Sequence, residues 1–353
     1  MKGLQRKTTL AGTLALGIVV ASGLLLGSNR VQSQNESDAS LLEASHRENG
    51  KFFNPWRRDP KTFWDIVNWQ LFSPNPYDKN RQPDIPTVEN DGAYLKENAD
   101  RASVTWVGHA TFVVHDGDDV FLTDPHFTNR ALLPRRIVPP GLPIEAIPED
   151  AFAVVSHNHY DHLDKGSIQK LPNTVSWFVP LGVADWVRGL GPRNVVELDW
   201  WQSAQYGRWK ITCLPSQHWS NRLGQPANST LWCSWLIESK DRKYFFAGDT
   251  GYFPGFAEFG RRFGPIDIAM LPIGAYEPRW VMSYQHLDPS EAYQAFKDLG
   301  ARYFLPMHWG TFDLTDEPMD LPPKELKQKI QERGGDLSRV HVFAIGERWQ
   351  VPD

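Results

Sequence analysis

Short apolar runs separated by turn-forming residues begin near residue 103 and continue through most of the chain. Runs of this length, rich in β-branched and aromatic side chains, are typical of strands. The runs that we expect to form strands are Ser103–Val107, Thr111–His115, Val120–Asp124, Phe152–Ser156, Val175–Val179, Trp209–Leu214, Leu231–Ile237, Tyr244–Phe246 and Ile266–Leu271. Because helical segments interrupt the later runs, the pattern predicts an α/β fold in which helices cover sheets.

The clearest helix is predicted for Ser290–Leu299. Asp288 is a suitable N-cap, Pro289 occupies the first helical position, and Glu291 completes a capping box. Gly300 then ends the helix.

The first 28 residues have a different pattern. Three basic residues, Lys2, Arg6 and Lys7, precede an apolar run from Leu10 to Leu26. This arrangement predicts a signal peptide or an N-terminal membrane anchor over residues 1–28. The basic flank should stay in the cytoplasm, so we expect an exported or anchored protein with its main domain outside, in the periplasm if the source is Gram-negative.

Residues 29–50 are polar and predict a flexible tether, and residues 51–102 form an N-terminal extension ahead of a catalytic domain at 103–353. The extension contains one aromatic helical stretch, Lys61–Phe72. Its expected buried stripe consists of Phe63, Ile66, Val67 and Leu71, and its additional aromatic surface of Trp64, Trp69 and Phe72. The stretch either packs on the domain or forms a lip that touches a bilayer.

Composition limits the possible functions. The chain has 353 residues, 41% of them hydrophobic, and a net charge of −5 with both signs scattered. It therefore lacks the basic stripe of a nucleic-acid-binding protein, and we expect no nucleic-acid partner. The only two cysteines, Cys213 and Cys233, form either one cross-strand disulfide or two buried thiols.

Four side chains that could bind metal follow the apolar run at residues 152–155: His157, His159, Asp161 and His162. In extended backbone His157 and His159 point to the same side, and a turn into a helix near Asp164 would direct Asp161 and His162 to a second point. Imidazole and carboxylate suit Zn²⁺, and also Fe or Mn. Four such groups in six residues favour two adjacent ions.

Three further candidate ligands follow other apolar runs: His218, Asp249 and His308. With them, the order of the ligands resembles that of the metallo-β-lactamase superfamily. The resemblance implies a four-layer αβ/βα sandwich with two mixed β-sheets flanked by helices, and two Zn²⁺ ions at the edges of the sheets. It implies that one ion is held by His157, His159 and His218. It implies that Asp161, His162 and His308 hold the other, with Asp249 between them.

Longer motifs resemble the N-acylphosphatidylethanolamine-hydrolysing phospholipase D family. They are Trp-Phe-Val-Pro-Leu-Gly (177–182), Glu-Leu-Asp-Trp-Trp (197–201), Gly-Asp-Thr-Gly-Tyr (248–252), Pro-Ile-Gly-Ala-Tyr-Glu-Pro-Arg-Trp (272–280), Tyr-Gln-His-Leu-Asp-Pro (284–289) and His-Trp-Gly-Thr-Phe (308–312). The likeness runs from near Phe53 almost to the C-terminus. It implies hydrolysis of a membrane phospholipid, N-acylphosphatidylethanolamine, to an N-acylethanolamine and phosphatidic acid.

The implied reaction gives roles to residues in and around these motifs. We count His286, Asp249 and Asp161 as catalytic: a hydroxide positioned by Asp249 and two metal ions would attack phosphorus, and His286 would hold the phosphate or assist the leaving alkoxide. Arg279 and Tyr276 are candidate substrate contacts, although Arg279 could equally form an ion pair. His109 and Asp124 are expected to orient the ligands.

Two other functions remain alternatives. One is a metallohydrolase of the same fold acting on a soluble lactone or nucleotide phosphodiester. The other is a zinc-binding scaffold without turnover, which the full ligand set disfavours. A lipid substrate implies contact with a membrane surface, and some members of this family form homodimers.

Overall fold

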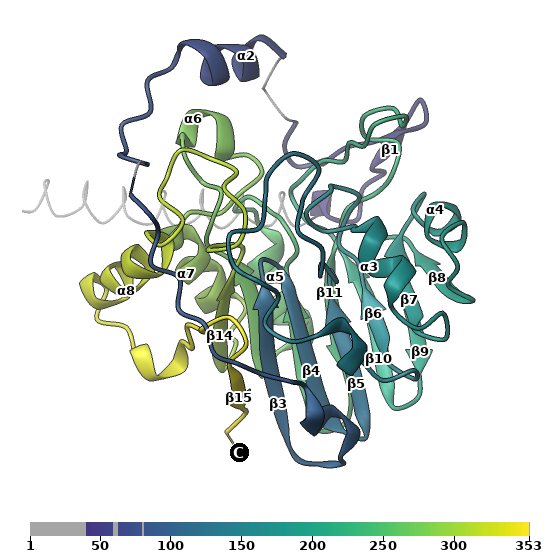
Figure 1. The fold of residues 1–353 in the computed structure, drawn as a ribbon. Helices are drawn as coiled ribbons and strands as arrows, with labels where there is room; N and C mark the ends of the chain where they lie inside the picture. Colours follow the sequence, from purple (N-terminus) through teal and green to yellow (C-terminus); the bar gives the residue numbers. More distant parts are fainter. Residues whose placement is uncertain (1–39, 59–62, 80, 353) are drawn as a thin grey trace, which may run out of the picture. The chain divides into compact units, whose positions relative to one another are not determined.

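The computed structural model describes residues 40–58, 63–79 and 81–352 (Figure 1). The chain divides into two units, Met1–Ser45 and His46–Asp353, and the second unit contains both large sheets. The predicted signal or anchor at residues 1–28 lies outside the described residues. The predicted tether at 29–50 is too long, because β1 (Arg47–Glu48) pairs with β2 (Lys51–Phe52) as part of the second unit.

The first large sheet has seven strands in the order β15-β3-β4-β5-β6-β7-β8. The strands are β15 (Arg348–Gln350), β3 (Ala99–Gly108), β4 (Thr111–Gly117), β5 (Asp119–Thr123), β6 (Phe152–Val154), β7 (Ser176–Pro180) and β8 (Asn194–Leu198). The strands from β5 to β8 are parallel, and the remaining pairs are antiparallel. The sheet is therefore mixed.

The second large sheet has six strands in the order β14-β13-β12-β11-β10-β9. The strands are β14 (Tyr303–Met307), β13 (Ile268–Pro272), β12 (Lys243–Phe246), β11 (Ser234–Glu238), β10 (Trp209–Leu214) and β9 (Ser203–Tyr206). Here β12, β13 and β14 are parallel and the other pairs antiparallel. This sheet is also mixed, so the α/β fold with two mixed sheets is confirmed.

The two sheets pack face to face (Figure 1). Successive side chains of a strand point to opposite faces of its sheet, so each strand has one set of side chains directed to the other sheet and one set directed to the helices. On β5, Val120 and Leu122 point to a core under helices, whereas the Phe121 ring packs edge-on against Trp209 and Tyr244 of the second sheet, with centroids 5.6 and 5.2 Å away. Each sheet thus contributes one face to the core between the sheets.

Helices cover the outer faces. Ile168 of α3 (Lys165–Lys170) and Val187 of α4 (Ala184–Arg188) pack into the core of the first sheet, and α7 (Pro289–Asp298) contacts β13 of the second. The other helices are α2 (Phe63–Phe72), α5 (Gly255–Phe263), α6 (Arg279–Met282), α8 (Pro322–Glu332) and the 3₁₀ helices η1 (Ala93–Lys96), η2 (Ile144–Ala146) and η3 (Leu337–Arg339). The capping box of α7, with Asp288 and Glu291, is present as predicted.

The helix α2 does not bury the stripe that its sequence predicts. Ile66 and Leu71 are exposed, Leu71 by 71%, and so are Trp64 and Phe72. The indole of Trp69 instead donates to Asp316 at 3.1 Å. The helix therefore makes a polar contact with the rest of the chain and presents several apolar side chains to solvent.

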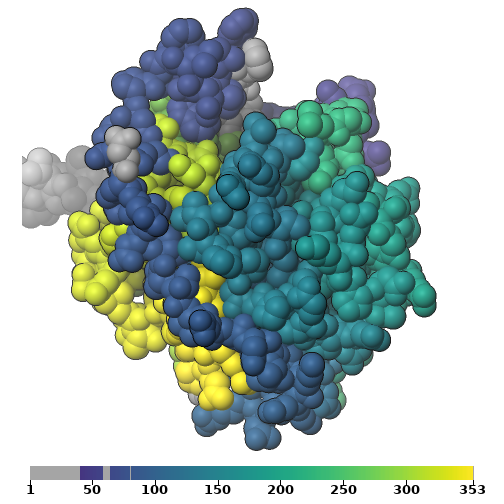
Figure 2. Space-filling model, in the orientation of Figure 1, coloured from purple at the N-terminus to yellow at the C-terminus, as the bar shows by residue number. Residues whose placement is uncertain are grey.

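From α2 the N-terminal extension passes along the C-terminal segments (Figures 1 and 2). Its polar contacts there include the pair of Arg81 with Asp320 and the hydrogen bond from the Val88 amide to the carbonyl of Ile345 at 2.8 Å. None of the helices in residues 40–58, 63–79 and 81–352 combines the length and the hydropathy needed to cross a bilayer. Cys213 and Cys233 are both free and buried, so the disulfide alternative is wrong.

Candidate metal centre

All seven predicted ligands come together at one edge of the sandwich, because strands of both sheets end there. His157 to His162 follow β6, His218 follows β10, Asp249 follows β12 and His308 follows β14. After His159 the chain turns, with the amide of Leu163 donating to the carbonyl of His159 at 2.8 Å, and α3 begins at Lys165 with the side chain of Asp164 as its N-cap. The turn separates the pair His157 and His159 from the pair Asp161 and His162.

The first group of side chains consists of three imidazoles, His157, His159 and His218. His159 Nδ1 lies 2.8 Å from His157 Nε2 and 3.3 Å from His218 Nε2. Burial lowers the pKa of His157 and of His218 well below the usual value, and that of His159 to about 4. Three neutral imidazoles with converging nitrogens suit the first shell of a divalent metal.

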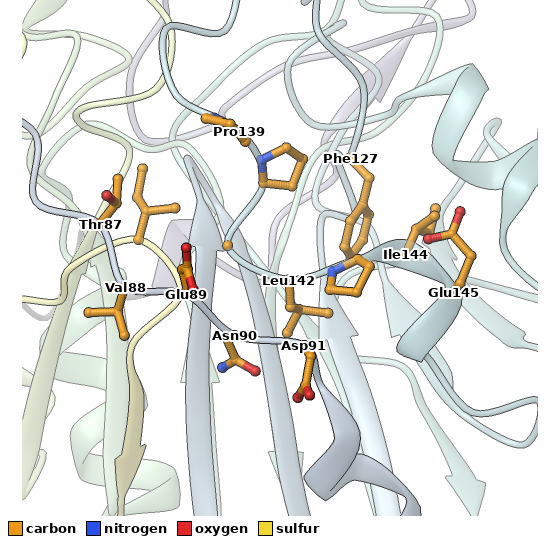
Figure 3. A pocket seen from close by; sticks show the side chains of 14 residues that line it. Thr87, Val88, Glu89, Asn90, Asp91, Phe127, Pro139, Leu142, Ile144 and Glu145 are labelled. Atoms are coloured by element: carbon orange, nitrogen blue, oxygen red, sulfur yellow. The ribbon is translucent and has the colours of Figure 1, made fainter.

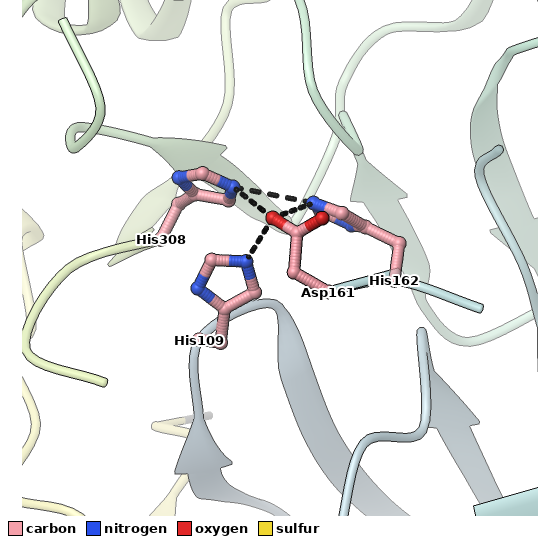
Figure 4. A group of neighbouring side chains, drawn as sticks. All are labelled: His109, Asp161, His162 and His308. Atoms are coloured by element: carbon pink, nitrogen blue, oxygen red, sulfur yellow. Dashed lines mark hydrogen bonds and ion pairs between the residues drawn. The ribbon is translucent and has the colours of Figure 1, made fainter. Parts of the chain in front are cut away.

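The second group consists of His109, Asp161, His162 and His308 (Figure 4). The Nε2 atoms of His162 and His308 are 3.2 Å apart, and Asp161 Oδ2 lies 3.4 Å from the first and 3.6 Å from the second. His109 Nε2 contacts the same carboxylate oxygen at 2.9 Å. A carboxylate and two imidazoles can hold a second ion, while His109 orients the carboxylate.

Asp249 lies between the two groups. Its carboxylate oxygens are 3.1 Å from His162 Nε2 and 3.0 Å from His308 Nε2, and one of them is 3.9 Å from Nε2 of both His157 and His218. A carboxylate in this position can contact ions on both sides. The fit of the donor set to two divalent ions thus rests on imidazole and carboxylate atoms only.

The charges of the second group are strongly coupled. Burial disfavours ionisation of Asp249 and Asp161, but the neighbouring imidazoles, His162 first, hold the pKa of both carboxyl groups well below the usual range. Burial also disfavours charge on His162 and His308. Their neighbouring carboxylates nevertheless raise the pKa of His162 well above its ordinary value and that of His308 to about 9. In the metal-free protein, protons on these imidazoles take the place of cations.

His286 approaches the centre from the loop between α6 and α7. Its Nδ1 lies 3.9 Å from Asp249 Oδ2, and its ring centroid lies 5.5 Å from those of His218 and His308. Asp249, His286 and His308 also form a group with ligand spacing. The side chain can therefore bind metal itself or exchange a proton with a group held at the centre.

Asp124 connects two ligands behind the centre. Its Oδ2 accepts from His162 Nδ1 at 2.6 Å and from the Ser156 hydroxyl at 2.6 Å, and that hydroxyl contacts His157 Nδ1 at 2.9 Å. Fixing the Nδ1 proton of each imidazole leaves Nε2 with a lone pair for metal. The sequence did not single out Ser156, because a serine after a strand has no motif of its own.

Strained backbone and a close backbone approach both occur at this edge. His109, Asp124 and His308 have φ angles of 55°, 35° and 67°, which residues other than glycine seldom adopt. A Cβ at Gly248, next to Asp249, would lie 2.4 Å from the Cβ of Ser156. Only glycine lets the β12 exit approach the β6 exit this closely.

The two predicted substrate contacts are engaged within the protein. Arg279 Nη2 donates to Glu291 at 2.7 Å, and its Nη1 donates to the carbonyl of His286 at 3.0 Å. The Tyr276 hydroxyl donates to Glu325 and the ring is buried. The structure therefore favours the ion-pair alternative for Arg279 and a positioning role for both residues over a direct phosphate contact.

One pocket, of about 560 Å³, adjoins the metal centre: His159 and Asp161 are among its lining residues, together with Trp219 and exposed leucines of two loops. A second pocket, of about 690 Å³, lies between residues 87–91 and 139–145 (Figure 3). None of the 14 residues that line it belongs to the groups described above. Of these two pockets, the first is the one that adjoins the metal centre.

Comparison with known proteins agrees with the fold. Residues 120–309 match the model of the beta-lactamase superfamily domain. N-acyl-phosphatidylethanolamine-hydrolyzing phospholipase D 1 of Caenorhabditis elegans is 34% identical over 329 residues, which cover 87% of this chain and 92% of that protein. The chain belongs to this phospholipase D family, within the metallo-β-lactamase superfamily.

One further relative agrees with that membership, and one solved structure agrees with the fold. A mitochondrial protein of Saccharomyces cerevisiae with the same enzyme name is 37% identical over 257 residues, 69% of this chain and 54% of that protein. Igni18, a metallo hydrolase of Ignicoccus hospitalis, shares the fold with a TM-score of 0.54 at 23% identity, over 70% of this chain and 97% of that one. As a member of the phospholipase D family, the chain is a metal-dependent phosphodiesterase.

Proposed function

We propose that the chain is a zinc-dependent phospholipase D that hydrolyses N-acylphosphatidylethanolamine to an N-acylethanolamine and phosphatidic acid. The observation that carries the proposal is the convergence of two ligand groups on either side of Asp249, in a chain that is similar over 87% of its length to an enzyme named for this reaction. Imidazole-rich groups favour zinc over harder cations.

His157, His159 and His218 would hold one ion, and Asp161, His162 and His308 the other, with Asp249 between them. Two bound divalent ions supply a water of lowered pKa and positive charge for the phosphoryl oxygens.

The side chains around the centre have separate roles in orienting groups and transferring a proton. Asp249 orients the attacking oxygen, and the His109 contact at 2.9 Å fixes the carboxylate of Asp161. His286, 3.9 Å from Asp249, is close enough to deliver a proton to the leaving ethanolamine oxygen. Arg279 holds the carbonyl of His286 and so sets the position of its ring.

Two features support a lipid as the substrate. The pocket beside His159 and Asp161 has an apolar rim, and α2 presents Trp64, Leu71 and Phe72 to solvent. Exposed aromatic and aliphatic side chains of this kind partition into the interface of a bilayer. We therefore propose a membrane surface as a partner and α2 as one point of contact.

The test is incubation of the purified, metal-loaded protein with N-acylphosphatidylethanolamine in detergent micelles, followed by mass spectrometry of the products. Two variants serve as comparison. His159→Ala removes a candidate ligand, whereas His341→Ala removes a half-exposed imidazole that contacts Glu347 at 2.9 Å and lies outside the ligand groups. We expect both products from the wild type and from His341→Ala, and neither from His159→Ala.

No product from a protein that carries about two metals per chain would refute the lipid assignment. A lactone or a nucleotide phosphodiester would then be tried, because a metallohydrolase of a soluble substrate is the second candidate. Inductively coupled plasma mass spectrometry of the same samples identifies the metal and tests zinc against iron and manganese.

Location and assembly remain predictions. The basic and apolar pattern of residues 1–28 supports export or anchoring, and cell fractionation with N-terminal sequencing of the mature protein tests it. A homodimer would double the mass measured by sedimentation equilibrium. Neither property enters the chemistry proposed above.

A further inference from the structure

The pocket of about 690 Å³ shares no lining residue with the metal centre (Figure 3). Residues 87–91 of the N-terminal extension line one side of it, and residues 139–145 of the connection between β5 and β6 line the other. Small-molecule sites in proteins have volumes of about 300–1,000 Å³. The pocket is therefore large enough to hold a ligand of its own.

The buried side chains that line this pocket are apolar. Phe127, Leu142 and Ile144 line it from the hydrophobic core of the first sheet. Val88, on the side of the extension, is 50% exposed. Three proline rings complete the apolar lining: Pro139, Pro140 and Pro143. The nonpolar part of a ligand would thus find apolar partners on both sides of the pocket.

Hydrogen bonds and close backbone contact hold the two sides in place. The Asn90 side chain donates to the carbonyl of Gly346 at 2.8 Å, and the Gly141 amide donates to the carbonyl of Val107 at 3.0 Å. A Cβ at Gly346 would lie 2.0 Å from the carbonyl oxygen of Val88 and 2.8 Å from that of Gly141. Because both sides are fixed to the same glycine segment, the pocket is preformed and a ligand need not open it.

Carboxylates line both sides of the pocket: Glu89 and Asp91 on the extension, and Glu145 opposite them (Figure 3). Asp91 accepts a hydrogen bond from the Ala93 amide at 2.9 Å. In the described part of the chain, none of the three pairs with a lysine, arginine or histidine side chain, and the 14 lining residues include no basic residue. The negative charge around the apolar lining is therefore not neutralised by a neighbouring side chain.

We propose that this pocket binds an organic cation that carries one primary ammonium group on an apolar body. Charge complementarity sets the sign of the ligand, because the lining has three carboxylates and no cation. Hydrogen bonding sets the kind of cation. A primary ammonium donates N–H bonds to carboxylates, whereas a quaternary ammonium is recognised mainly by aromatic rings. Phe127 is the one aromatic residue of the lining, and it is buried.

The proposal goes beyond the proposed function and does not depend on it. Its test is a ligand-observed NMR titration of the metal-loaded full chain with four probes: hexylamine, methylamine, 1-hexanol and hexyltrimethylammonium. Each methylene that becomes fully buried strengthens binding by up to about fourfold, so hexylamine should bind at least about tenfold more tightly than methylamine. Each contact of the ammonium with an exposed carboxylate adds up to about fivefold, so hexylamine should also bind more tightly than 1-hexanol.

The double variant Glu89→Gln/Glu145→Gln should lose most of the preference for hexylamine over 1-hexanol and still bind 1-hexanol as the wild type does. Both side chains are exposed, so the fold should be retained. The matched control is Glu149→Gln, an exposed glutamate that follows the lining segment but does not line the pocket. It should keep the wild-type preference.

Equal affinity of the wild type for hexylamine and 1-hexanol, or an unchanged preference in the double variant, overturns the proposal. Binding of hexyltrimethylammonium as tight as that of hexylamine also overturns it, because N–H bonds to the carboxylates would then not select the ligand. Hydrolysis of N-acylphosphatidylethanolamine tests the metal centre alone, so its absence would leave this binding result unchanged.

Discussion

Replacing Asp124 with asparagine would keep the shape of a fully buried side chain and change which atoms donate at the back of the metal centre. The Ser156 amide donates to Oδ1 at 2.6 Å, so the amide oxygen of the new side chain must stay there. Its NH₂ group then faces His162 Nδ1, which now lies 2.6 Å from a carboxylate oxygen. A donor at that position forces the proton of the neutral imidazole onto Nε2, the atom that faces the metal centre.

The expected magnitude follows from the two ligands that depend on Asp124. His162 is held directly, and His157 is held through the Ser156 hydroxyl. Loss of an outer carboxylate that orients one histidine ligand typically lowers metal affinity about 10- to 100-fold, or about 1.4–2.7 kcal/mol. With two ligands affected, we expect Asp124→Asn to reach the upper end of this range.

The assay is competition for Zn²⁺ between the protein and a chromogenic chelator, with metal content measured on the same samples. The control is Asp116→Asn, because Asp116 is also buried and accepts from the Tyr244 hydroxyl at 2.6 Å but lies outside the ligand groups. It should lower the melting temperature and leave zinc affinity unchanged. If Asp124→Asn bound two zinc ions as tightly as the wild type, the tautomer argument would be wrong.

Four further outcomes are expected. His286→Gln should retain its metals and lose about 10²–10⁴-fold in kcat, measured on micellar substrate, because it removes only proton transfer. The affinity for zinc should increase as pH rises towards 9, because the metal must displace the proton that His308 holds with a pKa of about 9. Calorimetry of zinc binding in two buffers of different ionisation enthalpy should show proton release below that pH. Removing zinc with a chelator should lower the melting temperature, and adding zinc back should restore it. Serine at Trp64, Leu71 and Phe72 together should weaken binding to phospholipid vesicles in a flotation assay without changing hydrolysis of a soluble diester.

The strand pattern was predictable wherever a strand is buried on both faces. All nine predicted runs coincide with strands within a few residues, because burial requires continuous apolar side chains there. The strands β8 (Asn194–Leu198), β9 (Ser203–Tyr206) and β15 (Arg348–Gln350) and the two-residue strands β1 and β2 were not predicted. The first three lie at sheet edges, and all five have exposed or half-exposed residues, so their sequences carry little of the apolar signal.

The helix α2 shows the opposite error. Its spacing of apolar residues predicts a buried stripe, yet Ile66 and Leu71 face solvent. The spacing of apolar residues indicates that one face of a helix is apolar, but it does not indicate what covers that face. A protein core and a lipid surface leave the same pattern, and only the structure shows that the core does not reach α2.

The candidate ligands, with His109 and Asp124 behind them, could be singled out in the sequence because metal binding restricts the choice of side chain, whereas the arginines that hold the surrounding loops could not. Three arginines hold the loops at this edge by donating to backbone carbonyls: Arg222 to those around His159, Arg279 to that of His286, and Arg136 to those of His126 and Val107. A carbonyl is present at every residue, so such a contact leaves no motif at the acceptor. The donor is visible only as one arginine among many, and Arg279 could be taken for a phosphate contact. An arginine beside a phosphate-processing centre is therefore best assigned after its carbonyl partners are known, since a guanidinium already engaged with a carbonyl and with Glu291 has few donors left for substrate.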